Sequence, residues 1–176
     1  VCMSAYTPSA LWRWHCQDDV LLLDTGSQSH RTGFKPAQLC STPIAQPFTL
    51  EHAEAYWLFW HQLESLGWPI EHCFAAAVDA VAGQFFLRQV GHKSWWFEPI
   101  SHQYQPIKGS LVLLKSAQSL LALVLCQNGE CARILLLQHG VNLQSKPLCA
   151  GQVLTVLRDR LQPYAVKLPL KFAKSA

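Results

Sequence analysis

The stretch PFTLEHAEAYWLFWHQLESLGWP, residues 47–69, carries the clearest structural signal in this chain of 176 residues. Thr49 is a good helix N-cap, because its hydroxyl can accept a hydrogen bond from a backbone N–H of the first turn. Gly67 and Pro69 then end the helix. At 100° per residue, one wide face of this helix is apolar and the opposite face is polar. The apolar face carries Ala53, Tyr56, Trp57, Phe59, Trp60 and Leu63, and the polar face carries Glu51, Glu54, His61, Gln62 and Ser65.

Leu58 is an exception, since it is an apolar residue in the middle of the polar face. We expect it either to contact a lid formed by another part of the chain or to belong to a partner-binding surface, and we favour the lid. A second helix is predicted over residues 70–88, where apolar residues recur at core spacing. Those residues are Phe74, Val78, Val81 and Phe85.

The residues before the first helix predict a small sheet. The apolar runs LWRWHC (11–16) and VLLLD (20–24) are separated by three polar residues, which indicates a hairpin. The run HRTGF (30–34) is a candidate third strand. Such a sheet needs a cover, and the two helices provide it, so the first half of the chain is predicted to be α/β.

The second half has a different character, with short β-type runs punctuated by proline, glycine and Asn128-Gly129. The runs are KSWWFEPI (93–100), GSLVLLK (109–115), QSLLALVLCQNG (118–129) and ECARILLLQHG (130–140). They predict an antiparallel sheet or small barrel. A short helix is expected to close it over residues 150–163, with Val153, Leu154, Leu157 and Leu161 facing inward.

The predicted fold class is therefore α+β, with two small domains. We expect an N-terminal extension over residues 1–11 and an α/β domain over 12–90, in which a short sheet is covered by two helices. A β-barrel-like domain with its short closing helix follows over 91–163. The basic tail takes up 164–176.

Asp24-Thr25-Gly26 follows an apolar run, as the active-site loop of an aspartic protease does. That chemistry needs two carboxylates that share one proton. A single copy would require a homodimer of the retroviral type, which is all β and has a glycine-rich flap where this chain has its predicted helices. We therefore interpret the motif as a strand ending in a turn, where Asp and Gly are favoured.

The seven cysteines are odd in number and follow no disulfide framework, which indicates reduced thiols. A structural zinc site needs paired ligands two to four residues apart. Cys126 and Cys131 are separated by four residues, but we expect them on the two strands of a hairpin that turns at Asn128-Gly129, and not at a metal site. No metal or other cofactor is predicted.

No apolar run reaches the roughly 18 residues of a membrane span. The longest candidate, LVLLKSAQSLLALVLC (111–126), is interrupted by Lys115, Ser116, Gln118 and Ser119. The N-terminus also lacks the basic and apolar segments of a secretory signal. We expect a cytoplasmic protein without membrane insertion.

Charge divides the chain into two unlike halves. Residues 1–90 hold four lysines and arginines against eight carboxylates, a net charge of −4, whereas residues 91–176 hold ten against three, a net charge of +7. A surface of one sign steers partners of the opposite sign toward it, so an acidic partner is expected for the second half. The lysines are spread singly, which disfavours nucleic acid.

A series of short motifs runs along nearly the whole chain, namely WRW (12–14), LLLD (21–24), Phe34, the aromatic AYWLFW helix (55–60), KSWWF (93–97) and RDRLQP (158–163). In their order and spacing, these motifs resemble the Z-ring-associated cell-division proteins of the ZapC family of gamma-proteobacteria. The resemblance implies a cytoplasmic, non-enzymatic protein of two domains at midcell. It also implies direct binding to FtsZ, an acidic tubulin-like GTPase with a flexible C-terminal segment, and lateral bundling of its protofilaments.

The expected partner-binding residues lie in the basic half and at its border. Arg88 and Lys93 flank the junction between the halves, within reach of Trp95 and Trp96. If this segment is a strand, Trp95 and Phe97 face one way and Trp96 the other. An acidic or C-terminal FtsZ segment is expected to dock there. The alternative contact residues are Lys108, Lys115 and Arg133.

Two other function classes remain open from the residues alone. One is a hydrolase, either a dimeric aspartic protease that uses Asp24 or a thiol enzyme. The other is an adaptor for a different acidic protein or for RNA. We expect a monomer, because the sequence has no heptad repeat and no long flat edge strand.

Overall fold

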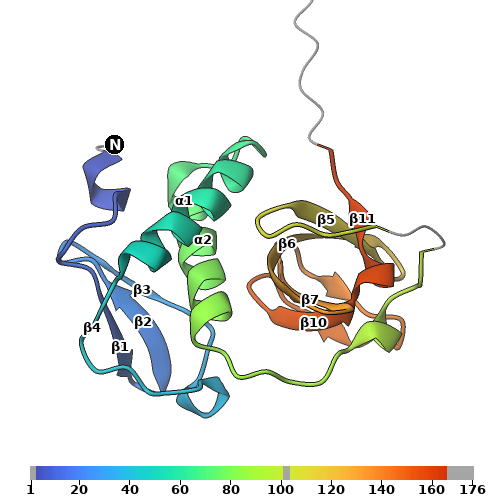
Figure 1. Ribbon diagram of the computed structural model, residues 1–176, viewed down its shortest axis with the longest axis horizontal. Helices are drawn as coiled ribbons and strands as arrows, with labels where there is room; N and C mark the ends of the chain where they lie inside the picture. The colour runs from blue at the N-terminus through green and yellow to red at the C-terminus, as the bar shows by residue number, and fades with distance from the viewer. Residues whose placement is uncertain (1–2, 101–103, 166–176) are drawn as a thin grey trace, which may run out of the picture.

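The computed structural model describes residues 3–100 and 104–165, and it places two antiparallel sheets on either side of a pair of helices (Figure 1). The predicted α+β class is confirmed. Of the expected basic tail, only Tyr164 and Ala165 are among the described residues. Within the described ranges, no helix combines the length and the apolarity needed to cross a lipid bilayer.

The N-terminal sheet has the strand order β3-β2-β1-β4. Its strands are β1 (Arg13–Gln17), β2 (Val20–Asp24), β3 (Ser29–Arg31) and β4 (Gln46–Pro47). The predicted hairpin and the third strand are confirmed. The β1–β2 turn consists of Asp18 and Asp19, which both have positive φ, and Asp tolerates this conformation better than most residues.

Both predicted helices are confirmed, as α1 (Leu50–Glu64) and α2 (Ile70–Phe85). Thr49 caps α1, since its Oγ1 accepts a hydrogen bond from the backbone N–H of His52 at 3.3 Å. The first 3₁₀ turn joins the aromatic core under the helices. Tyr6, at the end of the 3₁₀ turn η1 (Met3–Tyr6), packs on Trp60 and Phe74.

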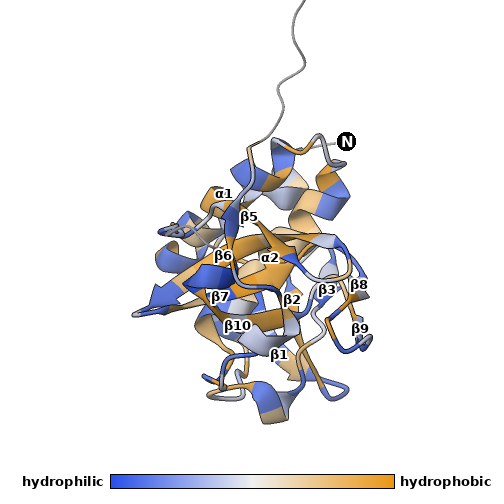
Figure 2. Cartoon of the chain, turned by 90° about the vertical axis from the view of Figure 1, so that its right-hand side faces the viewer, coloured by the Kyte–Doolittle hydropathy of each residue, from blue (hydrophilic) through white to orange (hydrophobic). Residues whose placement is uncertain are grey.

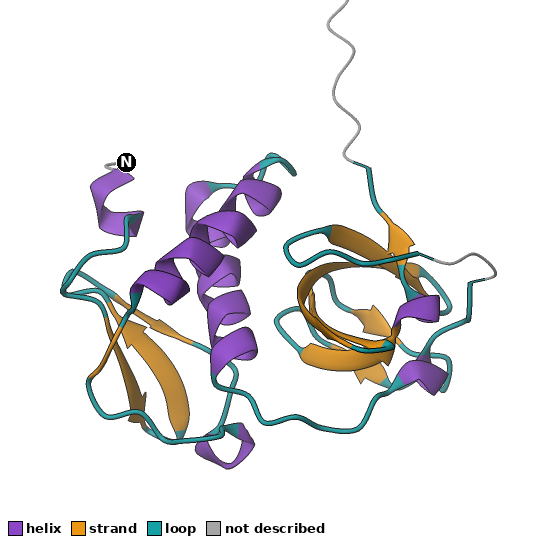
Figure 3. Cartoon of the chain, in the orientation of Figure 1, coloured by secondary structure: helices purple, strands orange, loops and turns teal. Residues whose placement is uncertain are grey.

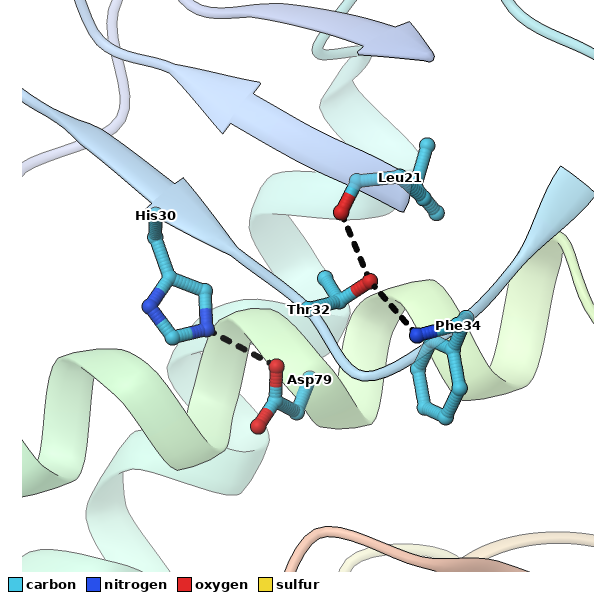
Figure 4. Close-up of polar contacts among 5 residues, drawn as sticks. All are labelled: Leu21, His30, Thr32, Phe34 and Asp79. Carbon is cyan, nitrogen blue, oxygen red and sulfur yellow. Dashed lines mark hydrogen bonds and ion pairs between the residues drawn. The ribbon is translucent and has the colours of Figure 1, made fainter. Parts of the chain in front are cut away.

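A polar contact ties β3 to α2 at the side of this core (Figure 4). Nε2 of His30 lies 2.8 Å from Oδ1 of Asp79. Burial raises the pKa of the Asp79 carboxyl, and the hydrogen bond with His30 partly opposes this effect. Next to this pair, the Thr32 hydroxyl donates to the carbonyl oxygen of Leu21 and accepts from the N–H of Phe34, which fixes the chain as it leaves β3.

The C-terminal sheet is strongly curled and has the order β10-β7-β6-β5-β11 (Figure 3). Its strands are β5 (Leu111–Lys115), β6 (Ser119–Asn128), β7 (Cys131–Leu136), β10 (Val153–Leu157) and β11 (Gln162–Pro163). A separate pair, β8 (Gly140–Val141) and β9 (Pro147–Leu148), lies between β7 and β10 in the chain. The end strands β10 and β11 do not pair with each other, so the sheet is barrel-like without being closed. The predicted β6–β7 hairpin is confirmed, but its turn lies one residue later than expected, at Gly129-Glu130, because Asn128 still pairs with Cys131.

The α2 helix packs against this curled sheet as well as against α1. A Cβ atom added to Gly83 would lie 2.9 Å from side-chain atoms of both Leu125 and Val153, so a larger residue here would require these side chains to shift. Apolar residues gather around α2 and β6 (Figure 2). The core beneath the helices continues onto one face of the C-terminal sheet, through Leu111, Leu121, Leu123, Leu125, Leu135 and Leu137.

Two predicted elements are wrong. The helix expected over residues 150–163 is instead β10, the 3₁₀ turn η4 (Arg158–Arg160) and β11. In β10, Leu154 and Val156 are buried while their neighbours are half-buried, which is the alternation of a strand paired with β7. The strand expected at KSWWF is the 3₁₀ turn η3 (Ser94–Trp96), with Trp95 exposed and Phe97 buried, so these two side chains do not share a face.

Candidate partner-binding surface

The η3 turn is held firmly against the C-terminal sheet. The N–H of Lys93 donates to the carbonyl oxygen of Thr155 at 2.7 Å. The Ser94 hydroxyl accepts from the N–H of Leu157, also at 2.7 Å. Phe97, which is only 1 % exposed, anchors the end of the turn in the core of the curled sheet. The turn therefore presents its side chains from a fixed backbone.

Lys93 and the two tryptophans of η3 form a compact cluster. Nζ of Lys93 lies 5.2 Å from the ring centroid of Trp95 and 5.6 Å from that of Trp96. These distances fall within the range of cation–π attraction. The His92 ring meets the Trp95 ring edge-on at 5.9 Å. Arg88 and Lys93 were both predicted to lie within reach of the tryptophan pair, and for Lys93 this is confirmed.

The two tryptophans differ in what they offer to a partner. Trp95 is 51 % exposed, which is unusual for so large an apolar side chain, whereas Trp96 packs against the core of the curled sheet. Leu143, 45 % exposed, follows the η3 backbone closely, because its N–H donates to the carbonyl oxygen of Trp96 at 3.0 Å. We call His92, Lys93, Trp95 and Leu143 together the η3 surface.

A groove of about 630 Å³ adjoins this surface. One wall is formed by Leu87 and by residues 89–92 of the linker, the segment 88–93 between α2 and η3, and the other by Cys126, Asn128 and Cys131 near the tip of the β6–β7 hairpin. Val90 of the linker is 62 % exposed at the edge of the groove. Because the linker leads directly into Lys93, the groove and the η3 surface are continuous.

Arg88 lies at the other end of the linker. It is exposed, yet its position is defined, since Nε donates to the carbonyl oxygen of Leu39 at 2.6 Å and its N–H donates to that of Gln38 at 2.9 Å. The linker therefore carries one cation at each end, Arg88 on the side of the N-terminal part and Lys93 on the C-terminal sheet.

Of the other three predicted contact residues, Lys108 and Lys115 lie apart from the groove and the η3 surface, and Arg133 makes hydrogen bonds within the chain. Lys108 borders a different cavity, with Glu51 and Leu58 of α1. Lys115 is exposed and forms an ion pair with Glu98 at 3.1 Å. Arg133 is buried, and its guanidinium donates to backbone carbonyl oxygens of α2 and the linker.

The sequence did not predict Leu143 of the η3 surface or Val90 at the edge of the groove. Leu143 has one local signal, the preceding Asn142, which is 1 % exposed. Its Oδ1 accepts from the N–H groups of Gln144 and Lys146, as an Asx turn does. An Asn of this kind predicts a tight turn with exposed neighbours, but it does not predict which surface the turn joins.

The structure gives Asp24 a local role. Its Oδ1 accepts a hydrogen bond from the N–H of Gly26 at 2.8 Å, and Gly26 has a φ of +85°, so the predicted turn is confirmed. Burial raises the pKa of the Cys16 and Cys73 thiols, which disfavours the reactive thiolate at both positions. Among residues 3–100 and 104–165, no three His, Cys, Asp or Glu side chains gather closely enough to hold a metal ion.

Comparison with known families and proteins gives a consistent result along the chain. The model of the N-terminal part of the cell-division protein ZapC matches residues 5–88, and the model of the C-terminal part matches residues 90–167. The chain is 27 % identical to the cell division protein ZapC of Proteus mirabilis over 164 residues, which cover 89 % of this chain and 90 % of that protein. It is also 27 % identical to the ZapC of Vibrio vulnificus over 165 residues, which cover 90 % and 92 % of the two chains.

Proposed function

Because the chain belongs to the ZapC family of cell-division proteins, we propose that it binds FtsZ directly and promotes lateral association of FtsZ protofilaments in the Z-ring. On this proposal it acts in the cytoplasm at midcell, as a monomer, without catalysis and without a cofactor. The contact surface is the linker from Arg88 to Lys93 together with the half-exposed Trp95, while Trp96 packs on the core of the curled sheet.

One observation carries the proposal, namely a half-exposed tryptophan with a lysine ammonium held over its ring on a fixed turn. An exposed aromatic of this kind contributes large contact area at low entropic cost, and tryptophan is enriched among the residues that dominate binding energy. The cations at the two ends of the linker steer an acidic partner toward the groove. An acidic segment of FtsZ fits this combination of charge and apolar surface.

Sedimentation of purified FtsZ with GTP, with and without this protein, tests the proposal. We expect the protein to pellet with FtsZ and to increase the pelleted fraction of FtsZ. The effect should weaken with rising salt, because exposed charges are screened within roughly 10 Å at about 0.1 M ionic strength. Absence of the protein from the pellet at low salt would contradict the proposal.

A further inference from the structure

Arg133 extends from the middle of β7 to the C-terminal end of α2. Its Nη1 donates to the carbonyl oxygens of Gly83 at 2.9 Å and Leu87 at 3.2 Å, and its Nη2 donates to that of Arg88 at 3.2 Å. A buried guanidinium is costly unless it is hydrogen-bonded. The last carbonyl groups of a helix lack partners inside the helix and carry partial negative charge. The guanidinium therefore provides hydrogen-bond donors for carbonyl groups at the end of the helix, and these carbonyl groups provide the acceptors that the buried guanidinium needs.

The other end of the linker is fixed by the residue opposite Arg133 in the sheet. Thr155 of β10 is the direct cross-strand partner of Arg133. Its carbonyl oxygen accepts the hydrogen bond from the N–H of Lys93. In the described parts of the chain, the exposed residues between the two anchors, 89–92, make no hydrogen bond of their own. Two adjacent residues of one sheet thus hold both ends of the linker.

The cations on this linker are attached to different parts of the molecule. The side chain and the N–H of Arg88 are bonded to Leu39 and Gln38 of the N-terminal part, whereas Lys93 is bonded to the C-terminal sheet. Arg133 reaches from that sheet to the Arg88 end. We infer that Arg133 is a positioning residue, which fixes the spacing between Arg88 and Lys93 and so sets the geometry of the FtsZ contact. The effect on FtsZ binding rests on the proposed function, and the structural part rests on the hydrogen bonds of Arg133, Arg88 and Lys93.

Native-state proteolysis tests the structural part without FtsZ. Trypsin cuts after Arg88 and Lys93, and in a folded protein the cutting rate follows local opening of the segment. We expect Arg133→Met to speed cleavage at these two bonds by about tenfold or more, because hydrogen bonds to a charged group are lost. Arg133→Lys keeps the charge but offers fewer directed donors, so its cleavage rate should be intermediate. Cleavage after Arg31, on the N-terminal sheet, should not change.

The matched control is Arg31→Met, which also removes one arginine but should leave linker cleavage at the wild-type rate. Wild-type cleavage of the linker in a folded Arg133→Met protein would overturn the inference. If Arg133→Met does not fold, the linker cleavage rate of Arg133→Lys is compared with that of the wild type, and an unchanged rate would overturn the inference.

Co-sedimentation with FtsZ then tests the consequence. We expect Arg133→Met to bind several-fold more weakly and Arg133→Lys to recover part of the binding. A loosened linker with unchanged FtsZ binding would overturn the positioning role. If the wild-type protein itself fails to pellet with FtsZ, the proposed function is wrong, while the cleavage rates still decide whether Arg133 holds the linker.

Discussion

Leu58 of α1 lies directly over Gly109 of the C-terminal part. A Cβ atom added to Gly109 would stand 2.7 Å from Cγ of Leu58, and Gly109 has a φ of +83°. The expected contact between Leu58 and another part of the chain is therefore confirmed. It explains why an apolar residue interrupts the polar face of α1, since the C-terminal part covers Leu58 in part and leaves it 39 % exposed.

Replacing Gly109 by alanine should lower the free energy of unfolding by about 2–4 kcal/mol, because the new methyl group adds a clash with Leu58 to the strain of positive φ. Gly129→Ala is the matched control. Gly129 also has positive φ but no heavy atom near the added Cβ, so its loss should be about 1–2 kcal/mol. Urea unfolding of both variants measures the difference, and equal losses would show that Leu58 gives way freely.

Trp95 and Trp96 should respond differently to alanine substitution. Trp95→Ala should weaken FtsZ binding by about 2 kcal/mol or more while leaving stability nearly unchanged, because the side chain is half-exposed. Trp96→Ala should mainly lower stability, since this ring packs on the core of the curled sheet. Thermal melting and co-sedimentation of both variants check the contrast. A Trp95→Ala protein that binds FtsZ like the wild type would remove Trp95 from the contact surface.

Local signals in the sequence predicted much of the fold. The N-cap Thr49, the helix stop at Gly67 and Pro69, and Gly129 in the β6–β7 turn each act within a few residues. The helix and the hairpin therefore follow from neighbours in the chain. The segment from 150 to 163 failed for the opposite reason. Its apolar residues fit helical spacing. However, β6 covers only one edge of β7, and the segment forms a strand because it pairs with the other edge. This pairing partner is distant in the sequence, so local spacing does not reveal it.

The candidate site divides in the same way. Lys93 and the tryptophans are neighbours in sequence, and their cluster could be predicted. The role of Arg133 could not, because its nearest acceptor, the carbonyl oxygen of Gly83, lies 50 residues earlier in the chain. From sequence alone, a lysine or arginine on a strand indicates an exposed cation, and only the packing of α2 on β7 shows that this one is buried.

The stability of the protein should fall as the pH drops below neutrality because of His52. Its Nδ1 accepts hydrogen bonds from Nε1 of Trp14 at 3.3 Å and from the N–H of Thr49 at 3.2 Å, so the ring is neutral in the folded state. Burial lowers the pKa of His52 below its ordinary value of 6.5, and nearby Glu51 only partly opposes this. The unfolded chain therefore binds the proton more readily, and folding loses stability as the pH falls through 6.5 toward the folded-state pKa.

Urea unfolding of the wild type and of His52→Gln at about pH 7.5 and about pH 5.5 isolates this effect, because glutamine does not titrate. The other histidines are common to both proteins and cancel in the comparison. We expect the wild type to lose more stability between the two pH values. An identical loss in both proteins would exclude His52 as the cause.

Asp24→Asn should leave both folding and FtsZ bundling unchanged. Asparagine retains an oxygen that can accept the hydrogen bond from the N–H of Gly26, so the turn persists. Melting temperature and co-sedimentation measure the two properties. Loss of bundling by a variant as stable as the wild type would point to a chemical role for the carboxylate and against a non-enzymatic protein.

The most direct test of the proposed surface is the affinity for FtsZ of the double variant Arg88→Glu, Lys93→Glu, measured by co-sedimentation at low and at physiological salt. Arg13→Glu with Arg31→Glu is the matched control, since it reverses two arginine charges on the N-terminal sheet and alters the net charge equally. Reversed charges at the contact cost about 1–5 kcal/mol, so we predict binding at least several-fold weaker at low salt for the first pair and near wild-type binding for the control. Wild-type affinity of a folded Arg88→Glu, Lys93→Glu protein at both salt concentrations would contradict the proposal that FtsZ binds at this linker.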